Sequence, residues 1–387
     1  MKKYVRVKIQ DLRLPLTVFG LWLAACSFIS CSEKKSESII EPLSITKYAE
    51  GFRITEIGES KLVDVVPYQQ ATITFQYLLV PLGEEVPPHS ATTQVIFVPI
   101  KNIVCTSTSH IPLLDYINET KKLIGFPTTD YISSKKMRQR IDSGFVKDLG
   151  IDKGMDVEAL YNLKPSLVMG YTIGKDLGQL KKIRELGIPV VINAEYLEKH
   201  PLGRAEWIKF MALFFGKEKD ADSIFSKIEN DYLSTLKSAA GATSTPTVMT
   251  GVLYGDAWFM PGGKNYAAKL LKDAGCNYLW ASDTTNGFLQ VSFESVFTKA
   301  KQADLWIGVG TFKTLTEIKA SEERYALFKS FTNKQVYTYN AKQGAKGGSE
   351  FLELGYLRPD LILKDLVKIA HPELLPNYEL FFHKRLE

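Results

Sequence analysis

Short apolar runs alternate with amphipathic segments from residue 103 onward. The runs at 103–105, 123–126 and 166–169 have the length and apolar content of buried strands. An apolar pattern at helical spacing separates the first two runs, and a capped helical pattern at 156–165 precedes the third. Strands and helices that alternate with short connections are typical of a parallel sheet covered by helices. The pattern predicts an α/β lobe whose ligand site lies beyond the carboxyl ends of its strands.

A second set of strand and helix patterns begins near Pro246 and repeats the order of the first. In each set a capping residue, an apolar residue and a glutamate open a helix, and an apolar strand follows. The two glutamates are Glu158 and Glu294. Between the sets, about 202–240 shows helical periodicity without a strand pattern, with Gly216 as a candidate break. We therefore predict an α/β fold of two related βα lobes joined by a long rigid helix.

Residues 51–99 follow another pattern, in which apolar and polar positions alternate and turns separate the runs. We expect these strands to be added to the edge of the first lobe, in a structural role. The predicted segments are a lipoprotein signal and the start of a tether at 1–31, a polar tether at 32–50, an N-terminal α/β lobe with added edge strands at 51–200, an interlobe helix at 201–240 and a C-terminal α/β lobe at 241–387.

The first 31 residues have the features of an export signal: a basic start, an apolar run at 14–23 and small residues after it. That run is shorter than the roughly 20 apolar residues that span a bilayer. The sequence Leu-Ala-Ala-Cys at 23–26 has the form of a bacterial lipobox, which predicts lipidation of Cys26, and Cys31 beside the polar tether is the alternative. We expect an exported protein, lipid-anchored at the periplasmic or cell-envelope face of a bacterial membrane.

The charge of the chain lies mostly at its amino terminus. The formal net charge is +5 over 387 residues, but the first 25 residues hold five basic residues and one acidic residue, which leaves 43 basic against 42 acidic residues in the rest. This balance excludes an extended basic surface for nucleic acid. No HExxH, GxSxG or CxxC pattern occurs, which argues against a histidine-based metal site and against an enzyme. Cys105 and Cys276 lie in apolar contexts and are expected as buried free thiols.

Three pieces of the first lobe resemble a known family. They are the strand and turn at 103–110, Leu-Ile-Gly at 123–125, and Val-Glu-Ala-Leu at 157–160 before Lys-Pro-x-Leu-Val. The segment is similar to the first lobe of the substrate-binding proteins of ABC importers for iron–siderophore, haem and cobalamin, and the resemblance extends over about 100–370. It implies the class III, helical-backbone fold, a monomer, no catalytic activity and no intrinsic cofactor. It also implies an ABC permease and its ATPase as partners, a small-molecule metal chelate as cargo, and Glu158 and Glu294 as the residues that dock onto permease arginines.

The ligand face is expected at the strand-end turns of both lobes. Aromatic residues clustered on a predicted loop at 254–260 suit the flat face of a macrocycle or an aromatic chelate. The basic segment 135–140 suits an anionic chelate such as a siderophore or haem propionates. The predicted ligand-binding residues are His110, Tyr131, Arg138, Arg140, Tyr171, Tyr254, Trp258, Phe259, Lys264 and Phe288.

Each of these sites has a plainer structural alternative. The loop around Trp258 could fold back on its own lobe, and the basic segment could be a solvated face. Glu158 and Glu294 could simply complement the dipoles of their helices. His110 and Tyr131 are candidate axial ligands to haem iron, although a histidine in a turn is often only hydrogen-bonded. No metal site made by the protein alone is expected.

The predicted function is a substrate-binding lipoprotein of an ABC importer that captures a metal chelate and delivers it to the permease. Iron–siderophore is the first expectation for the cargo, with cobalamin and haem as alternatives. Two other functions stay open. One is a chelatase-like enzyme of metal or tetrapyrrole chemistry that uses His110 with Asp130 or Glu350. The other is a surface lipoprotein that binds haem independently of any permease.

Overall fold

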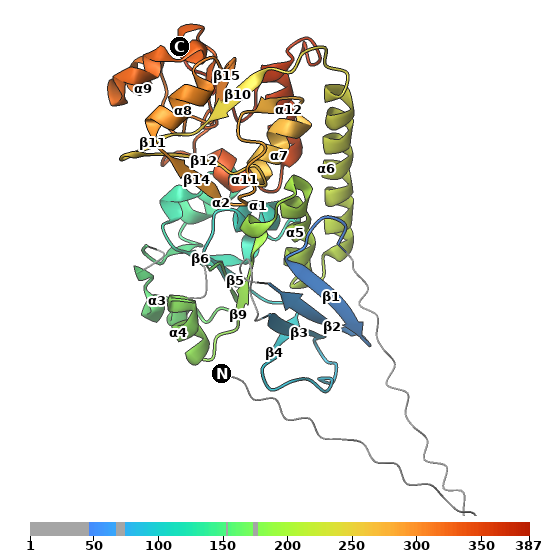
Figure 1. Cartoon of the computed structure of the whole chain (residues 1–387). Helices are drawn as coiled ribbons and strands as arrows, with labels where there is room; N and C mark the ends of the chain where they lie inside the picture. The colour runs from blue at the N-terminus through green and yellow to red at the C-terminus, as the bar shows by residue number, and fades with distance from the viewer. Residues whose placement is uncertain (1–45, 67–73, 152–153, 173–176) are drawn as a thin grey trace, which may run out of the picture. The chain divides into compact units, whose positions relative to one another are not determined.

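The computed structural model describes residues 46–66, 74–151, 154–172 and 177–387 (Figure 1). Cys26 and Cys31, and with them both predicted lipidation sites, lie outside the described residues, as does the predicted tether up to residue 45. Within the described ranges, no helix has the length and apolar content that a membrane crossing requires.

The first lobe is built on a five-stranded parallel sheet with the strand order β7-β6-β5-β8-β9. The chain continues from the central strand β5 to β6 on one side and later returns to β8 on the other side. The strand order therefore reverses between β5 and β8, and a ligand crevice is expected at the carboxyl ends of strands beside such a point. The strands are β5 (Ile103–Cys105), β6 (Leu123–Phe126), β7 (Lys147–Asp148), β8 (Val168–Gly170) and β9 (Val190–Ile192). The helices are α1 (His110–Tyr116), η1 (Thr120–Lys122), η2 (Thr129–Tyr131), α2 (Lys135–Asp142), α3 (Val157–Leu163), α4 (Gln179–Glu185) and η4 (Glu195–Leu197).

The second lobe repeats this arrangement around β10, so the predicted α/β fold of two βα lobes is confirmed. Its main sheet has the order β13-β10-β15-β16-β17, in which the last strand alone runs antiparallel. The strands are β10 (Thr247–Thr250), β13 (Asn277–Tyr278), β15 (Leu305–Ile307), β16 (Val336–Thr338) and β17 (Lys384–Arg385). A separate antiparallel sheet contains β11 (Val252–Tyr254), β12 (Ala257–Pro261) and β14 (Phe288–Val291). The helices are α7 (Tyr266–Asp273), α8 (Phe293–Ala300), α9 (Leu315–Ser321), η5 (Glu323–Leu327), α10 (Lys329–Thr332), α11 (Glu350–Leu354) and α12 (Pro359–Ala370).

The strands before the first lobe form a sheet of their own, which we call the accessory sheet. It contains β1 (Phe52–Ile57), β2 (Ser60–Val65), β3 (Phe75–Pro81) and β4 (Gln94–Val98) in that order. The prediction that these strands extend the edge of the first lobe is therefore wrong.

Side chains explain why the two sheets stay separate. The backbone N–H of Ile192 in the edge strand β9 donates to the Tyr77 hydroxyl at 3.0 Å. The side-chain amide of Gln94 accepts from Val190 N at 3.4 Å and donates to Val190 O at 3.3 Å. Side chains of the accessory sheet thus satisfy backbone groups of β9 that would otherwise need another strand.

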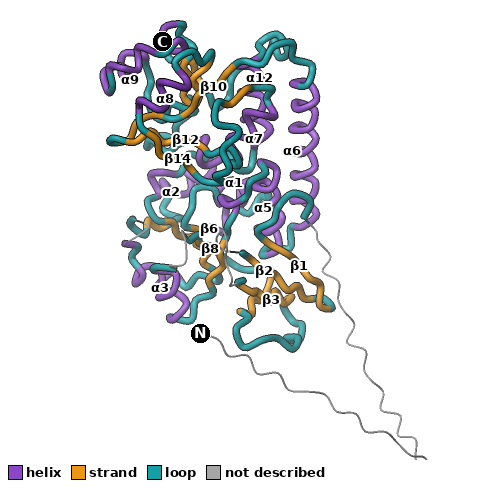
Figure 2. The backbone as a smooth tube through the Cα atoms, in the orientation of Figure 1, coloured by secondary structure: helices purple, strands orange, loops and turns teal. Residues whose placement is uncertain are grey.

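Two helices, rather than one long helix, connect the lobes. The predicted helix at 201–240 is broken into α5 (Pro201–Leu213) and α6 (Glu218–Ala239). The break is at Gly216, whose φ of 64° lies in the left-handed region that ends helices. The helix α6 has 22 residues, about 33 Å at 1.5 Å per residue, and it runs beside α5 and α12 (Figures 1 and 2).

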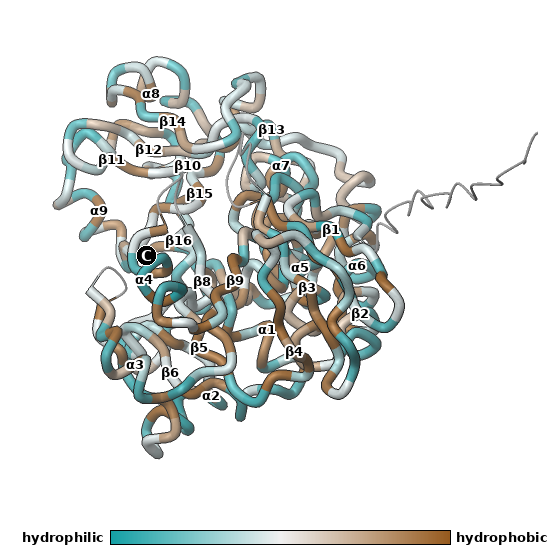
Figure 3. The backbone as a smooth tube through the Cα atoms, turned by 90° about the horizontal axis from the view of Figure 1, so that it is seen from below, coloured by the Kyte–Doolittle hydropathy of each residue, from teal (hydrophilic) through white to brown (hydrophobic). Residues whose placement is uncertain are grey.

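The connecting helix α5 is buried on nearly all of its faces. Trp207, Phe210 and Phe214 are fully buried, and the Phe52 ring of the accessory sheet contacts both Trp207 and Phe210. One apolar core therefore joins the accessory sheet, α5 and the second lobe, and apolar residues also line β3 and β5 (Figure 3). Cys105 and Cys276 are buried and free, as predicted.

Candidate functional site

Polar side chains gather at the carboxyl ends of the first lobe's strands. Ser109 follows β5, Thr172 follows β8, and Glu195 follows β9. The Ser109 hydroxyl donates to Glu195 Oε1, and the Tyr196 hydroxyl donates to the Thr172 carbonyl oxygen. These hydrogen bonds connect the segments that follow β5, β8 and β9. The segments lie beside the point where the strand order reverses, which is where a ligand crevice is expected in an α/β sheet.

His110 lies beneath this surface and does not reach a ligand. Its side chain is fully buried, and Nε2 lies 3.9 Å from Glu195 Oε1. Burial lowers the pKa of His110 to about 3, so the imidazole is neutral, and burial raises the pKa of Glu195. The prediction of His110 as a ligand-binding or iron-ligating residue is therefore wrong. The turn that carries it is the start of α1, and the first residue of that helix points into the lobe.

Arg204 joins the first lobe, the connecting helix α5 and the second lobe. Its Nη2 donates to Tyr196 O at 2.7 Å and its Nε donates to Glu198 O at 3.2 Å. On the other side, the guanidinium carbon lies 3.4 Å from the centre of the Tyr266 ring and 4.4 Å from that of Tyr356. Both tyrosines belong to the second lobe, and burial raises the pKa of Tyr266 to about 12.

Sequence reasoning missed this group because Arg204 belongs to no motif. A signal was present, since α5 is apolar apart from a few charged residues such as Arg204 and Glu206. Charged residues in a helix that is otherwise apolar are expected to be buried with partners. Their partners, however, lie in distant parts of the chain, which the sequence does not identify.

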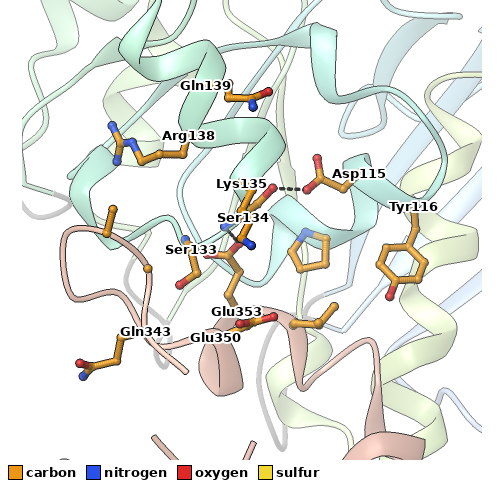
Figure 4. A pocket seen from close by; sticks show the side chains of 14 residues that line it. Asp115, Tyr116, Ser133, Ser134, Lys135, Arg138, Gln139, Gln343, Glu350 and Glu353 are labelled. Carbon is orange, nitrogen blue, oxygen red and sulfur yellow. Dashed lines mark hydrogen bonds between the residues drawn. The ribbon is translucent and has the colours of Figure 1, made fainter. Parts of the chain in front are cut away.

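An interlobe cavity of about 510 Å³ lies between the two lobes (Figure 4). On the first lobe it is lined by α1 and by residues 133–139, which follow β6. On the second lobe it is lined by residues 343–345, which follow β16, and by α11. Loops at the carboxyl ends of parallel strands from both lobes thus meet around one space.

The two lobes touch beside this cavity through Glu353 of α11. The backbone N–H groups of Ser133 and Ser134 donate to its two carboxylate oxygens at 2.5 and 2.8 Å. A further close approach requires Gly348, because a Cβ at this position would lie 2.0 Å from the Tyr131 carbonyl oxygen. Burial raises the pKa of Glu353 to about 7, Asp115 and Glu350 act in the same direction, and the two backbone hydrogen bonds oppose them.

The predicted basic residues separate on the two sides of α2. Arg138 lines the interlobe cavity, where it donates to Asp142 at 3.0 Å and to Thr129 O at 2.9 Å, and its ligand contact stays a prediction. Arg140 donates to Lys121 O and Leu123 O, which lie at the amino end of β6. The prediction of Arg140 as a ligand-binding residue is wrong, because that end of the sheet is opposite to the strand-end loops.

The predicted aromatic group is divided by the alternation of side chains along β12. Trp258 is fully buried: its ring stacks 5.5 Å from that of Trp306, and its Nε1 donates to Thr250 O at 2.9 Å. The prediction of Trp258 as a ligand-binding residue is therefore wrong, because this side chain points into its own lobe. Phe259, the next residue, points to the opposite face of the sheet.

That opposite face is exposed and aromatic, and we call it the aromatic face. In the strand register Phe259 pairs with Val252 and Gln290, Tyr254 with Ala257, and Phe288 with Pro261. Paired residues share a face, so these seven residues form one surface. Tyr254 is 81% exposed and Phe288 is 66% exposed, which leaves both rings available to a ligand.

The remaining predicted ligand residues lie on loops. Tyr131 is exposed in η2, after β6. Tyr171 follows β8, is half-buried, and has its ring edge-on to that of Tyr196 at 6.5 Å. Lys264 precedes α7, whose N-cap is Asn265, and is exposed. A ligand contact stays a prediction for all three. Among the described residues there is no group of three or more His, Cys, Asp or Glu that could hold a metal ion.

Glu158 and Glu294 occupy matching positions on the two lobes. Asp156 accepts from Ala159 N at 2.9 Å and caps α3, and Ser292 accepts from Ser295 N at 3.2 Å and caps α8, as predicted. Both glutamates are exposed in the first turn of their helices. Glu294 also accepts from Arg324 Nη1 at 3.1 Å. The helices α3 and α8 lie on the side away from α6 (Figure 1).

Some known proteins are similar to this chain in sequence, and others are similar in fold. An uncharacterized lipoprotein of Methanocaldococcus jannaschii is 27% identical over 300 residues, 75% of this chain and 69% of the relative. A second uncharacterized lipoprotein of that archaeon is 27% identical over 354 residues, 86% and 84% of the two chains. A periplasmic heme-binding protein from Roseiflexus has a TM-score of 0.54 at 16% identity and covers 71% of this chain and 99% of its own. A Helicobacter pylori protein with bound Ni(II) has a TM-score of 0.56 at 18% identity and covers 74% and 88%.

At these identities the structural neighbours show the fold. The family is shown by a sequence model described as periplasmic binding protein, which matches residues 103–342, more than half of the chain. The match begins at β5 and ends after β16, so it covers the first lobe and most of the second, and it leaves out the accessory sheet, α11, α12 and β17. This chain belongs to the periplasmic binding protein family.

Proposed function

We propose that this protein is the substrate-binding lipoprotein of an ABC importer and that it captures a metal chelate between its two lobes. The observation that carries the proposal is the interlobe cavity, around which strand-end loops of both lobes meet. A ligand held there contacts both lobes at once, so its binding is linked to their approach. Iron–siderophore is the first candidate for the cargo, and haem and cobalamin are the alternatives.

Side chains that line the cavity, and separately those of the aromatic face, support a charged, partly aromatic cargo. Lys135 and Arg138 line the cavity together with the carboxyl groups of Asp115, Glu350 and Glu353, and these two cations are the groups proposed to hold the anionic part of a chelate. The exposed rings of Tyr254 and Phe288 suit its flat, apolar part. The heme-binding protein from Roseiflexus and the Ni(II)-bound protein from Helicobacter pylori support a metal-containing cargo by analogy of fold.

Glu158 and Glu294 are proposed to dock onto arginines of the permease. Each is exposed in the first turn of a helix, one on each lobe, so a partner that bridges the lobes can engage both. Charged contacts of this kind set orientation and the rate of association more than affinity. The protein performs no chemical step in this scheme, because the energy for transport comes from the ATPase of the importer.

The protein is proposed to be exported and held at a membrane surface by acyl chains on Cys26, with Cys31 as the alternative. The two lipoproteins of Methanocaldococcus jannaschii support this proposal. The chelatase-like alternative relied on His110 at a metal. That imidazole is fully buried, so the alternative has lost the residue on which it depended.

Titration of the purified chain with haemin, a ferric siderophore and cyanocobalamin tests the cargo. Quenching of tryptophan fluorescence is expected to saturate at one equivalent for one of the three. Retention of the unchanged ligand separates binding from turnover by an enzyme. If none of the three binds, the metal-chelate assignment is wrong.

A double variant, Glu158→Ala with Glu294→Ala, tests the partner. It is expected to bind cargo as the unchanged protein does and to lose uptake in cells. The matched control replaces two other exposed glutamates, Glu185→Ala with Glu373→Ala, and is expected to retain uptake. Uptake that survives the docking substitutions would favour a lipoprotein that works without a permease.

A further inference from the structure

We propose that Glu353 is a proton-controlled contact between the lobes, so that closing the lobes takes up a proton and the cargo is held more tightly in mildly acidic than in alkaline solution. The tighter hold on cargo rests on the proposed function, whereas proton uptake on closing does not depend on it.

Glu353 caps a helix that belongs to the other lobe. It lies in α11 of the second lobe and is 2% exposed, while its partners Ser133 and Ser134 directly precede α2 of the first lobe. Ser134 is itself the N-cap of α2, since its hydroxyl accepts from Met137 N at 3.2 Å. A carboxylate at a helix amino terminus is bound by unpaired N–H groups and by the helix dipole. This contact therefore holds the two lobes together at one edge of the cavity.

The same place carries an excess of negative charge. Asp115 of α1 and Glu350 of α11 line the cavity with Glu353, so three carboxylates from both lobes converge there. Asp115 already accepts hydrogen bonds from the hydroxyls of Ser134 and Thr120. Like charges brought together in a buried site disfavour the ionised form.

The cations around the cavity are engaged elsewhere or exposed. Arg138 donates to Asp142 and to Thr129 O, and Lys135 is exposed. Outside the cavity wall, Arg358 donates to Tyr116 and Asp360, and Lys346 lies 3.9 Å from Asp130.

The direction of the pH effect follows from these contacts. The pKa of Glu353 is raised to about 7 while the lobes touch, because the first lobe removes water and adds Asp115. When the lobes separate, the carboxylate meets water, and its pKa returns toward 4.5, the usual value for glutamate. A group whose pKa is higher in the closed form takes up a proton on closing at any pH between these two pKa values. Closing is therefore weakest above pH 7 and strengthens as the pH falls through 7 toward 4.5.

The size of the effect follows from the same two values. One unit of pKa corresponds to a factor of ten in the equilibrium. Between pH 8 and pH 6 the closing equilibrium is expected to rise about tenfold. Glu353, Ser133 and Ser134 also line the interlobe cavity, so this contact borders the space proposed for the cargo.

Hydrogen–deuterium exchange of the full chain without ligand tests the contact. The protection of amides at 131–136 is compared with that of Glu353→Gln at the same pH, which cancels the intrinsic pH dependence of exchange. Protection of the unchanged chain relative to this variant is expected to be about tenfold greater at pH 6 than at pH 8. A ratio that stays within twofold overturns the proposal. The control Glu373→Gln, an exposed site, is expected to match the unchanged chain.

A second variant keeps Glu353 and so does not depend on the folding of the first. Glu350→Gln removes one like charge, and the midpoint of the protection profile is expected to move to lower pH. An unchanged midpoint contradicts the electrostatic basis of the proposal.

Binding of haemin, a ferric siderophore and cyanocobalamin at pH 6 and pH 8 then separates the two proposals. For the probe that binds, affinity relative to Glu353→Gln is expected to rise about tenfold at the lower pH. If the exchange ratio changes tenfold and no probe binds, the metal-chelate function fails and the proton-controlled contact stands. If a probe binds with the same relative affinity at both values, the function stands and the control of cargo by Glu353 fails.

Discussion

The guanidinium carbon of Arg204 lies 3.4 Å from the centre of the Tyr266 ring, and this contact joins the connecting helix α5 to the second lobe. The same side chain donates to two carbonyl groups at the end of the first lobe. Arg204 therefore contacts three parts of the fold: the first lobe, α5 and the second lobe.

Arg204→Ala is expected to lower the free energy of unfolding by about 2 kcal/mol or more, since a desolvated cation–π contact and two hydrogen bonds are lost. Arg204→Lys keeps the charge but not the planar guanidinium group, so its stability should lie between that of the unchanged chain and that of Arg204→Ala. Urea unfolding measures both. The exposed Arg53→Ala serves as the control and should change the free energy by less than about 0.5 kcal/mol. An Arg204→Ala chain as stable as this control would contradict the proposed linkage.

The two faces of the sheet formed by β11, β12 and β14 predict opposite effects of alanine substitutions. Trp258→Ala should cost about 3–5 kcal/mol of stability, because it empties a fully buried site against Trp306. Phe288→Ala should leave stability within about 0.5 kcal/mol and weaken binding of the cargo instead, because its ring is exposed on the aromatic face. Urea unfolding and fluorescence titration of both variants check this. A large loss of stability in Phe288→Ala would show that its ring packs on the lobe.

The end of the predicted tether is bound to the connecting helix. Glu206 of α5 accepts hydrogen bonds from the backbone N–H groups of Lys47, Tyr48 and Ala49 at 2.7–3.0 Å, and Glu198 accepts those of Glu50 and Gly51 at 2.8–3.0 Å. These two carboxylates are buried.

A chain that begins at residue 52 should therefore be less stable than one that begins at residue 46, by about 3 kcal/mol, because two buried carboxylates lose five backbone N–H donors, although Glu198 keeps Trp207 Nε1 and Glu206 keeps Lys209. The midpoint of urea unfolding of the two chains measures the difference. Equal midpoints would mean that 46–51 adds nothing to the folded unit. In the longer chain, Glu206→Gln should keep part of the stabilisation that residues 46–51 provide, since an amide oxygen still accepts from these N–H groups.

His110 predicts a loss of stability in acid. Burial lowers its pKa to about 3 in the folded protein, against the usual 6.5 for histidine, so the imidazole of the unfolded chain binds a proton first as the pH falls. The contribution of the neutral imidazole to the free energy of unfolding is fully present above pH 6.5. It is lost as the pH falls toward 3, by about 1.4 kcal/mol per pH unit. Urea unfolding of the unchanged chain and of His110→Leu at pH 7, 6 and 5 isolates this effect, because other groups cancel in the difference. Parallel pH profiles would contradict a neutral, buried imidazole.

The local elements of both lobes could be predicted from the sequence because their signals lie within a few residues. Apolar runs marked β5, β6 and β15, and the capping residues Asp156 and Ser292 marked the starts of α3 and α8. The apolar surroundings of Cys105 and Cys276 indicated their burial correctly. The order of these elements was also enough to predict two matching lobes.

The candidate site was predicted less well, since it depends on contacts between distant segments. The sequence placed Trp258 and Phe259 in one aromatic group, but pairing with β11 and β14 turns them to opposite faces of a sheet. Arg204 and Tyr266 are far apart in sequence, and neither has a local feature that names the other. The pattern of side chains within one turn or strand determined which elements form. The packing of those elements determined which side chains became buried, which met across the lobes and which stayed open to a ligand, because burial and contact depend on the whole chain.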